Sequence, residues 1–225
     1  MRLIKIECEL RYRERMRVLQ GYEALYADVM GREPERARQW AVPGLRIEDK
    51  ERKRVVLVDP ARSVIAVEQP PDVAYCRRHV TQFFDSVNKR LTIPKIGRCG
   101  LRSTWVEEHR DTFSDLLATY KERLLTQAEP VAGAQDVAAV LEYGVGSGQK
   151  VTVTTGPMEK TQLQSQYLTF ELGECPEIFL YIDSDFGDVA RGDYSRRELA
   201  DFFDRALSEG EKRANEIVAR IRGMQ

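Results

Sequence analysis

Hydrophobic and polar residues alternate along the first segment of the chain. Apolar side chains occupy every second position from Ile4 to Tyr12, and charged side chains occupy the positions between them. A period of two is typical of a β-strand with one face on a core and one in water. The pattern therefore predicts a strand over 4–12, and similar short runs predict strands at 45–48, 54–58, 63–68 and 96–106.

Other segments follow the helical period. Apolar residues recur every three or four positions over 14–31, and Gly31 and Pro34 are typical helix-ending residues. The same spacing predicts a helix that begins after Pro71 and ends before Pro94. It also predicts a helix from Phe113 to 124, and a long closing helix from 195 to about 222.

The second half contains two further predicted strand pairs. Residues 137–143 and 150–155 flank the string Gly144-Val-Gly-Ser-Gly148, which we interpret as a hairpin loop. Its spacing is not that of a phosphate-binding loop, and a predicted strand follows it where such a loop would need a helix. Residues 163–172 and 177–183 predict the second pair.

These elements predict an α+β protein with mostly antiparallel sheets and helices on one face. The halves also resemble one another. Each has a meander, a strand that ends in an acidic residue, and then a helix with Phe-Phe-Asp, at Phe83–Asp85 and at Phe202–Asp204. A match in equivalent contexts favours an internal duplication of one helix-on-sheet unit.

The two halves of the chain also differ in their charge. Residues 1–110 carry 23 Lys and Arg against 16 Asp and Glu, whereas residues 111–225 carry 12 against 20, although the net charge is only −1. Such asymmetry is typical of a protein with a partner surface. We predict a basic unit over 1–108 and an acidic unit over 109–225, either separate or joined in one continuous domain.

The composition also argues against several classes of protein and of binding site. The four cysteines, Cys8, Cys76, Cys99 and Cys175, are widely spaced, and the chain has two histidines, so neither a zinc site nor a disulfide framework is indicated. No apolar run is long enough to span a bilayer, and the charged start of the chain does not resemble a signal peptide. We therefore expect a cytoplasmic protein without a cofactor and without membrane contact.

Arginines are frequent in the first half. Arg11 and Arg13 project from the polar side of the first predicted strand, and Arg98 and Arg102 lie on the mid-chain strand. A basic patch of this kind can contact nucleic-acid phosphates. Acidic residues interleave with it and no aromatic stacking motif accompanies it, so a solvated or partner-facing surface is the competing interpretation.

Two aspartates close the last predicted strand. Asp183 and Asp185 are separated by a single residue, and side chains at positions i and i+2 of a strand lie on the same face. They could share a divalent cation, and the string Tyr181–Asp188 is similar to the aspartate strand of nucleotidyl cyclase and polymerase palm domains. The alternative is an acidic loop that leads into the N-terminus of a helix, where negative charge is favourable.

Three features together resemble a sporadically distributed family of uncharacterised bacterial proteins. These are the strand Gly97-Arg-Cys-Gly-Leu-Arg102, the acidic strand end near Ile182-Asp183, and the long final helix. The resemblance implies a bacterial source. It implies no established reaction, so no catalytic residues are carried over from it.

The sequence favours a non-enzymatic role, because no catalytic arrangement of Ser, Cys, His and Asp can be assembled from it. Our leading hypothesis is an interaction or assembly subunit of a bacterial multiprotein system, such as a defence system, which binds a protein partner or associates with itself. One alternative is a nucleic-acid-binding protein that uses Arg11, Arg13, Arg98 and Arg102. A second is a metal-dependent phosphotransfer enzyme or nuclease at Asp183 and Asp185.

Overall fold

A computed structural model describes residues 1–12, 21–31, 40–41, 44–91, 96–110, 112–125, 136–146, 149–173, 175–189 and 194–223. The first half contains β1 (Arg2–Tyr12), α1 (Tyr22–Met30), β2 (Trp40–Ala41), β3 (Gly44–Asp49), β4 (Arg54–Val58), β5 (Arg62–Glu68) and α2 (Val73–Leu91). The second half contains β6 (Ile96–Glu108), α3 (Phe113–Leu124), β7 (Ala139–Gly144), β8 (Lys150–Glu159), α4 (Lys160–Tyr167), β9 (Ile178–Val189) and α5 (Arg196–Arg222).

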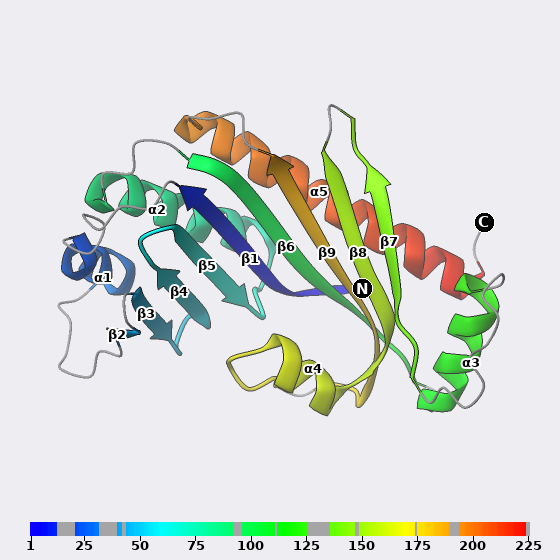
Figure 1. Cartoon of the computed structure of the whole chain (residues 1–225). Helices are drawn as coiled ribbons and strands as arrows, with labels where there is room; N and C mark the ends of the chain where they lie inside the picture. Colours follow the sequence, from blue (N-terminus) through cyan, green and yellow to red (C-terminus); the bar gives the residue numbers. More distant parts are fainter. Residues whose placement is uncertain are drawn as a thin grey trace.

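The strands form one sheet in the order β2-β3-β4-β5-β1-β6-β9-β8-β7 (Figure 1). Every neighbouring pair is antiparallel. The predicted α+β class with an antiparallel sheet is therefore confirmed. From Ile6 to Tyr12 the alternation has the predicted result, since the apolar side chains are buried in the main core and the charged ones are more exposed. Ile4 departs from the prediction, because an irregularity in the pairing between Leu3 and Lys5 places it in a second cluster on the other face.

The main core lies between the sheet and a layer of helices. In Figure 1, α2 and α5 run behind the sheet, and the core cluster joins their apolar sides to those of the central strands. The closing helix begins at an N-cap, Ser195, whose hydroxyl accepts a hydrogen bond from the Glu198 amide in a capping box. Its apolar residues recur at helical spacing, and Phe202 is completely buried.

A glycine lets α5 lie close to the centre of the sheet. A Cβ atom at Gly210 would stand 2.6 Å from Ser103 Oγ and 3.4 Å from Ser184 Cβ. Ser103 and Ser184 are register partners on β6 and β9, so two small side chains meet the glycine of the helix. This contact fixes the position of α5 against the two strands that carry the candidate site.

One helix lies on the opposite side of the sheet, contrary to the prediction that the helices share one face. Figure 1 shows α4 in front of the strands, where Leu163 packs in a small second cluster with Ile4 and Phe179. The predicted strand over 163–172 is wrong. Glu159 and Gln162 form a capping box that starts a helix there, and 168–172 continue without regular structure.

The segment after α4 is tied to the first half of the chain. The Glu68 carboxylate, which is 1% exposed, accepts hydrogen bonds at 2.9 Å from the amides of Thr169 and Phe170. The Phe170 side chain packs on Val55 and Ala66. Helix α4 and residues 168–172 thus cover one part of the face opposite α2 and α5.

Strand β9 is longer than predicted. It was predicted over 177–183, but it continues to Val189, pairing with β6 as far as Val189 and with β8 as far as Gly187. The interpretation of this acidic segment as a strand exit that leads into a helix N-terminus is therefore wrong, because both aspartates lie within the sheet.

The two halves repeat one order of elements. β1-α1-β3-β4-β5-α2 corresponds to β6-α3-β7-β8-β9-α5, with β2 and α4 as additions, and the two sets of strands run outward from the central β1–β6 pair in the same order. This is the order that a duplication would produce, and the duplication itself stays a prediction. The sheet continues across residue 108, because β6 pairs with β1 on one side and with β9 on the other.

The opposite charges of the two halves meet within the chain. Arg102 of the first half forms an ion pair with Asp183 of the second, and Arg77 on α2 forms one with Asp204 on α5. None of the helices in the described part of the chain combines the length and the apolar character that a membrane crossing needs.

Candidate functional site

The charged residues predicted from the sequence gather on the open face, which we define as the side chains of the sheet that point away from α2 and α5. The three central strands carry charges of alternating sign there. β1 presents Glu7 and Glu9 between Lys5 and Arg11, β6 presents Arg98 and Arg102, and β9 presents Asp183 and Asp185. Because neighbouring strands lie about 4.8 Å apart, Arg102 has an acidic register partner within reach on each side, Glu7 on β1 and Asp185 on β9, whereas Arg98 lies opposite Arg11 of β1.

Arg102 lies at the centre of these charges, and its guanidinium is held by a buried carboxylate. Its Nε donates a hydrogen bond to Asp183 Oδ2 at 2.7 Å, and Thr104 Oγ1 donates to Asp183 Oδ1 at 2.9 Å. The Asp183 side chain is 4% exposed, whereas that of Arg102 is 48% exposed. The carboxylate is therefore buried and engaged at both oxygens, while the guanidinium keeps donors that face the solvent.

The anchor also fixes the charge of Arg102. The hydrogen bond and the negative charge of Asp183 raise the pKa of the Arg102 guanidinium above its ordinary value, against the opposing effect of burial. A guanidinium with a raised pKa and a held position is a permanent, preorganised cation. Such a group can bind a carboxylate or a carbonyl of a partner with little loss of side-chain freedom.

Asp185 lies beside Arg102 as its register partner on β9 and is exposed. Partial desolvation by the surrounding sheet raises its pKa above the ordinary carboxyl value, and the charges of Asp183 and Glu9 act in the same direction. The guanidiniums of Arg102 and Arg98 oppose this rise. Asp185 thus offers an accessible acceptor between two cations.

An aromatic side chain borders the site where α4 crosses the open face. The guanidinium carbon of Arg102 lies 5.6 Å from the centroid of the Tyr167 ring, a distance typical of a cation–π contact. The Tyr167 ring in turn lies 5.8 Å from that of Tyr181, and the Tyr167 carbonyl accepts a hydrogen bond from Lys5 Nζ at 2.8 Å. Arginine next to tyrosine is a combination that often dominates binding at protein interfaces.

The open face has a second basic feature at one end of the strands. Arg62, Arg11 and Arg98 are register partners across β5, β1 and β6. Arg11 Nε lies 2.5 Å from Glu9 Oε1, and Arg62 lies 2.8 Å from Asp59 Oδ2. Arg98 is exposed, and its guanidinium lies over Gly187, where a Cβ atom would be 3.3 Å from Arg98 Nη2.

The structure therefore brings most of the predicted residues together. Arg11, Arg98, Arg102, Asp183 and Asp185 share the open face, although the sequence assigned them to two different functions. Arg13 lies outside the described residues.

Protein groups already occupy the carboxylate oxygens that would bind the predicted metal ion at Asp183. Both oxygens of Asp183 are already hydrogen-bonded to protein groups, so a cation at Asp183 would have to displace Arg102 or Thr104. Within the described ranges, no group of three or more His, Cys, Asp or Glu side chains is placed to hold a metal ion. The metal site stays a prediction.

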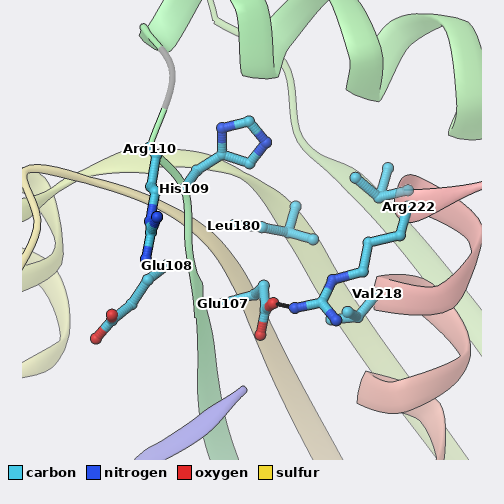
Figure 2. A pocket seen from close by; sticks show the side chains of 8 residues that line it. Glu107, Glu108, His109, Arg110, Leu180, Val218 and Arg222 are labelled. Atoms are coloured by element: carbon cyan, nitrogen blue, oxygen red, sulfur yellow. Dashed lines mark ion pairs between the residues drawn. The ribbon is translucent and has the colours of Figure 1, made fainter.

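A separate cavity of about 300 Å³ lies at the far end of β6 (Figure 2). Glu107, 8% exposed, forms an ion pair with Arg222 of α5 across this cavity, and Leu180 and Val218 supply its apolar wall. His109 and Arg110 line it from the end of β6. The Glu107–Arg222 pair joins the end of the sheet to the end of the closing helix, which is a structural role.

Sequence reasoning missed three members of the site. Thr104 and Glu9 were passed over because a threonine or a glutamate in a strand has no distinctive spacing, and their roles come from residues on other strands. Tyr167 was missed because its segment was predicted as strand. Tyr167 is far from Lys5 and Arg102 in the sequence, so no local pattern indicated that the three residues lie together.

No protein-family model matches this chain, and no curated protein matches its sequence. The function is therefore inferred from the geometry of the open face.

Proposed function

We propose that this protein is a non-enzymatic assembly subunit that binds a protein partner on the open face of its sheet, around Arg102. The observation that carries the proposal is the preorganised arginine: Arg102 is held by the buried Asp183, faces the solvent, and lies between Tyr167 and Asp185. Residues of this kind, fixed before binding and central in a surface, supply most of the binding free energy at protein interfaces.

The charge pattern favours a protein over a nucleic acid. A nucleic-acid backbone laid across the open face would place phosphates near Arg98 and Arg102, but also near Glu7 and Glu9 on one side and Asp185 on the other. The mixture of charges on the open face instead complements a protein surface that carries both signs, with carboxylates toward Arg102 and basic residues toward Glu7 and Asp185.

One part of the open face, where three arginines are register partners, favours the nucleic-acid alternative. Arg62, Arg11 and Arg98 lie side by side on three strands, and a phosphate could bind between them. Glu9 neutralises part of this charge, since it contacts both Arg11 and Arg62. Nucleic-acid binding is therefore our second candidate, and the experiment below separates it from the first.

The test is copurification of the tagged full-length chain from its own cells, with two charge reversals on the open face, Arg98→Glu and Asp185→Lys. Lys212→Glu, on the exposed side of α5, is the matched control. We expect a partner that is retained by the wild type and by the control and is lost with either open-face variant, because each reversal sets like charges opposite the partner. Equal retention by all four proteins would contradict the proposal.

Fluorescence anisotropy with short single-stranded and duplex oligonucleotides tests the alternative. The proposal predicts weak binding that Arg98→Ala leaves unchanged. Tight binding that falls steeply with salt and is lost in Arg98→Ala would replace a protein partner with a nucleic acid.

A further inference from the structure

The outer edge of β7 presents hydrogen-bonding groups that no described strand covers. β7 is the last strand of the sheet and pairs only with β8. The Val145 amide donates to the Gln149 carbonyl at 2.9 Å, so the backbone groups of odd-numbered residues point toward β8. In an antiparallel ladder the direction alternates, so the backbone groups of Val140, Glu142 and Gly144 point outward.

A tyrosine confirms this assignment at the other end of the strand. The Ala139 amide donates to Tyr120 Oη at 3.1 Å, and Tyr120 Oη donates to the Thr155 carbonyl at 2.7 Å. Ala139 and Thr155 are register partners, so the hydroxyl of α3 bridges the two backbone groups on the β8 side of β7. The outward groups of the even-numbered residues are not affected by this bridge.

The side chains of β7 do not protect this edge. Val140 is 67% exposed, more than any other large hydrophobic residue in the described part of the chain. The strand contains neither proline nor lysine, the residues that commonly block edge strands. Its single charge, on Glu142, is paired with Lys150 Nζ at 2.6 Å.

We propose that β7 pairs with β7 of a second copy of this chain across a two-fold axis, so that the two sheets become continuous. The favoured register places Leu141 opposite Leu141 of the partner subunit. On the helix side it then sets the small Ala139 opposite the large Tyr143 of the partner subunit. On the open side it sets Val140 opposite the partner's Glu142.

The charges disfavour one of the two neighbouring registers. A shift that centres the axis on Glu142 would place two carboxylates directly opposite each other, and like charges in that position are unfavourable. With Leu141 at the axis, the carboxylates lie diagonally and each keeps its Lys150. This surface is distinct from the site around Arg102, so the proposal does not depend on the proposed function.

Sedimentation equilibrium of the full chain tests the proposal. The wild type is expected to reach a mass twice the 25.9 kDa of the chain as concentration rises. Val140→Glu sets two like-charged pairs across the axis and should raise the dissociation constant about tenfold. Val140→Lys, at the same position, sets two opposite-charged pairs and should leave the dimer as tight or tighter.

Two further variants complete the test. Leu141→Cys, in a Cys175→Ser background, should form a disulfide-linked dimer on oxidation, because residues opposite each other in a non-hydrogen-bonded pair lie at a bridging distance. Val73→Glu on α2, where Val73 is 41% exposed, should leave the mass unchanged. A wild type that stays monomeric at every concentration would overturn the proposal. A dimer that responds equally to Val140→Glu and Val140→Lys would also overturn it.

Discussion

The pair formed by Arg102 and Asp183 should be asymmetric, in that the loss of one partner costs more than the loss of the other. Asp183 is 4% exposed, whereas Arg102 is 48% exposed. If arginine is removed, a buried carboxylate keeps only the hydrogen bond from Thr104. If aspartate is removed, the half-exposed guanidinium can turn to water.

The magnitudes follow from this difference in burial. Arg102→Ala leaves an uncompensated buried charge and should lower the free energy of unfolding by about 3–5 kcal/mol. Asp183→Ala removes hydrogen bonds to a charged group that water can replace, and should lower it by about 1–3 kcal/mol. The double variant should cost less than the sum of the two, because neither charge is left alone.

Urea unfolding followed by circular dichroism measures these free energies, and Arg11→Ala is the matched control. Arg11 lies on the same face and has a carboxylate at 2.5 Å, but its side chain is 52% exposed, so its loss should cost about 0–1 kcal/mol. If Arg102→Ala were no more destabilising than Arg11→Ala, or less so than Asp183→Ala, the preorganisation of Arg102 would be refuted.

Three further perturbations test other parts of the fold. Gly210→Ala should destabilise by about 1–3 kcal/mol in thermal melts despite the better helix propensity of alanine, because the new Cβ meets Ser103 Oγ at 2.6 Å; a stabilised variant would contradict this. His79 has a pKa lowered by burial to about 4, so stability should fall as the pH drops from about 6.5 to 4, by about 1–2 kcal/mol after allowance for its partial exposure. That slope should become smaller in His79→Gln, whereas an unchanged slope would assign it to other groups, such as Asp49, whose pKa is lowered. Glu68→Gln should speed amide hydrogen exchange at 168–172 about tenfold while global stability changes little, whereas unchanged exchange would show that the carboxylate does not hold this segment.

Local patterns were sufficient for most of the elements. The alternation over 4–12 identified β1 because one face is buried from Ile6 to Tyr12, and the strand predicted at 54–58 coincides with β4. The closing helix was predicted with nearly its observed bounds, because an N-cap serine and a continuous apolar stripe are local signals.

The failures have a common physical cause in contacts between distant residues. β9 was predicted to end at Asp183, and aspartate is indeed unfavourable in strands by propensity. Arg102, 81 residues earlier, neutralises that aspartate and lets the strand continue. Similarly, the segment after α4 is placed by Glu68, about 100 residues away, and no periodic pattern could reveal that contact.

Most residues of the candidate site were predicted from the sequence, but not that they lie together on one surface. Arginines and aspartates were recognised as two groups with separate chemistry, because β6 and β9 are far apart in sequence. Their pairing in the sheet turns two apparent sites into one surface of alternating charge.

The central claim, that a protein partner binds the open face around Arg102, is tested most directly by site-specific photo-crosslinking in the cell. A benzophenone side chain placed at Thr152, which pairs with Asp185 on the open face, is compared with one at the exposed Ser208 of α5. We predict a discrete protein adduct from position 152 that disappears when Arg98→Glu is added, and no such adduct from position 208. Equal adducts from both positions, or an adduct at 152 that does not respond to the charge reversal, would contradict the account.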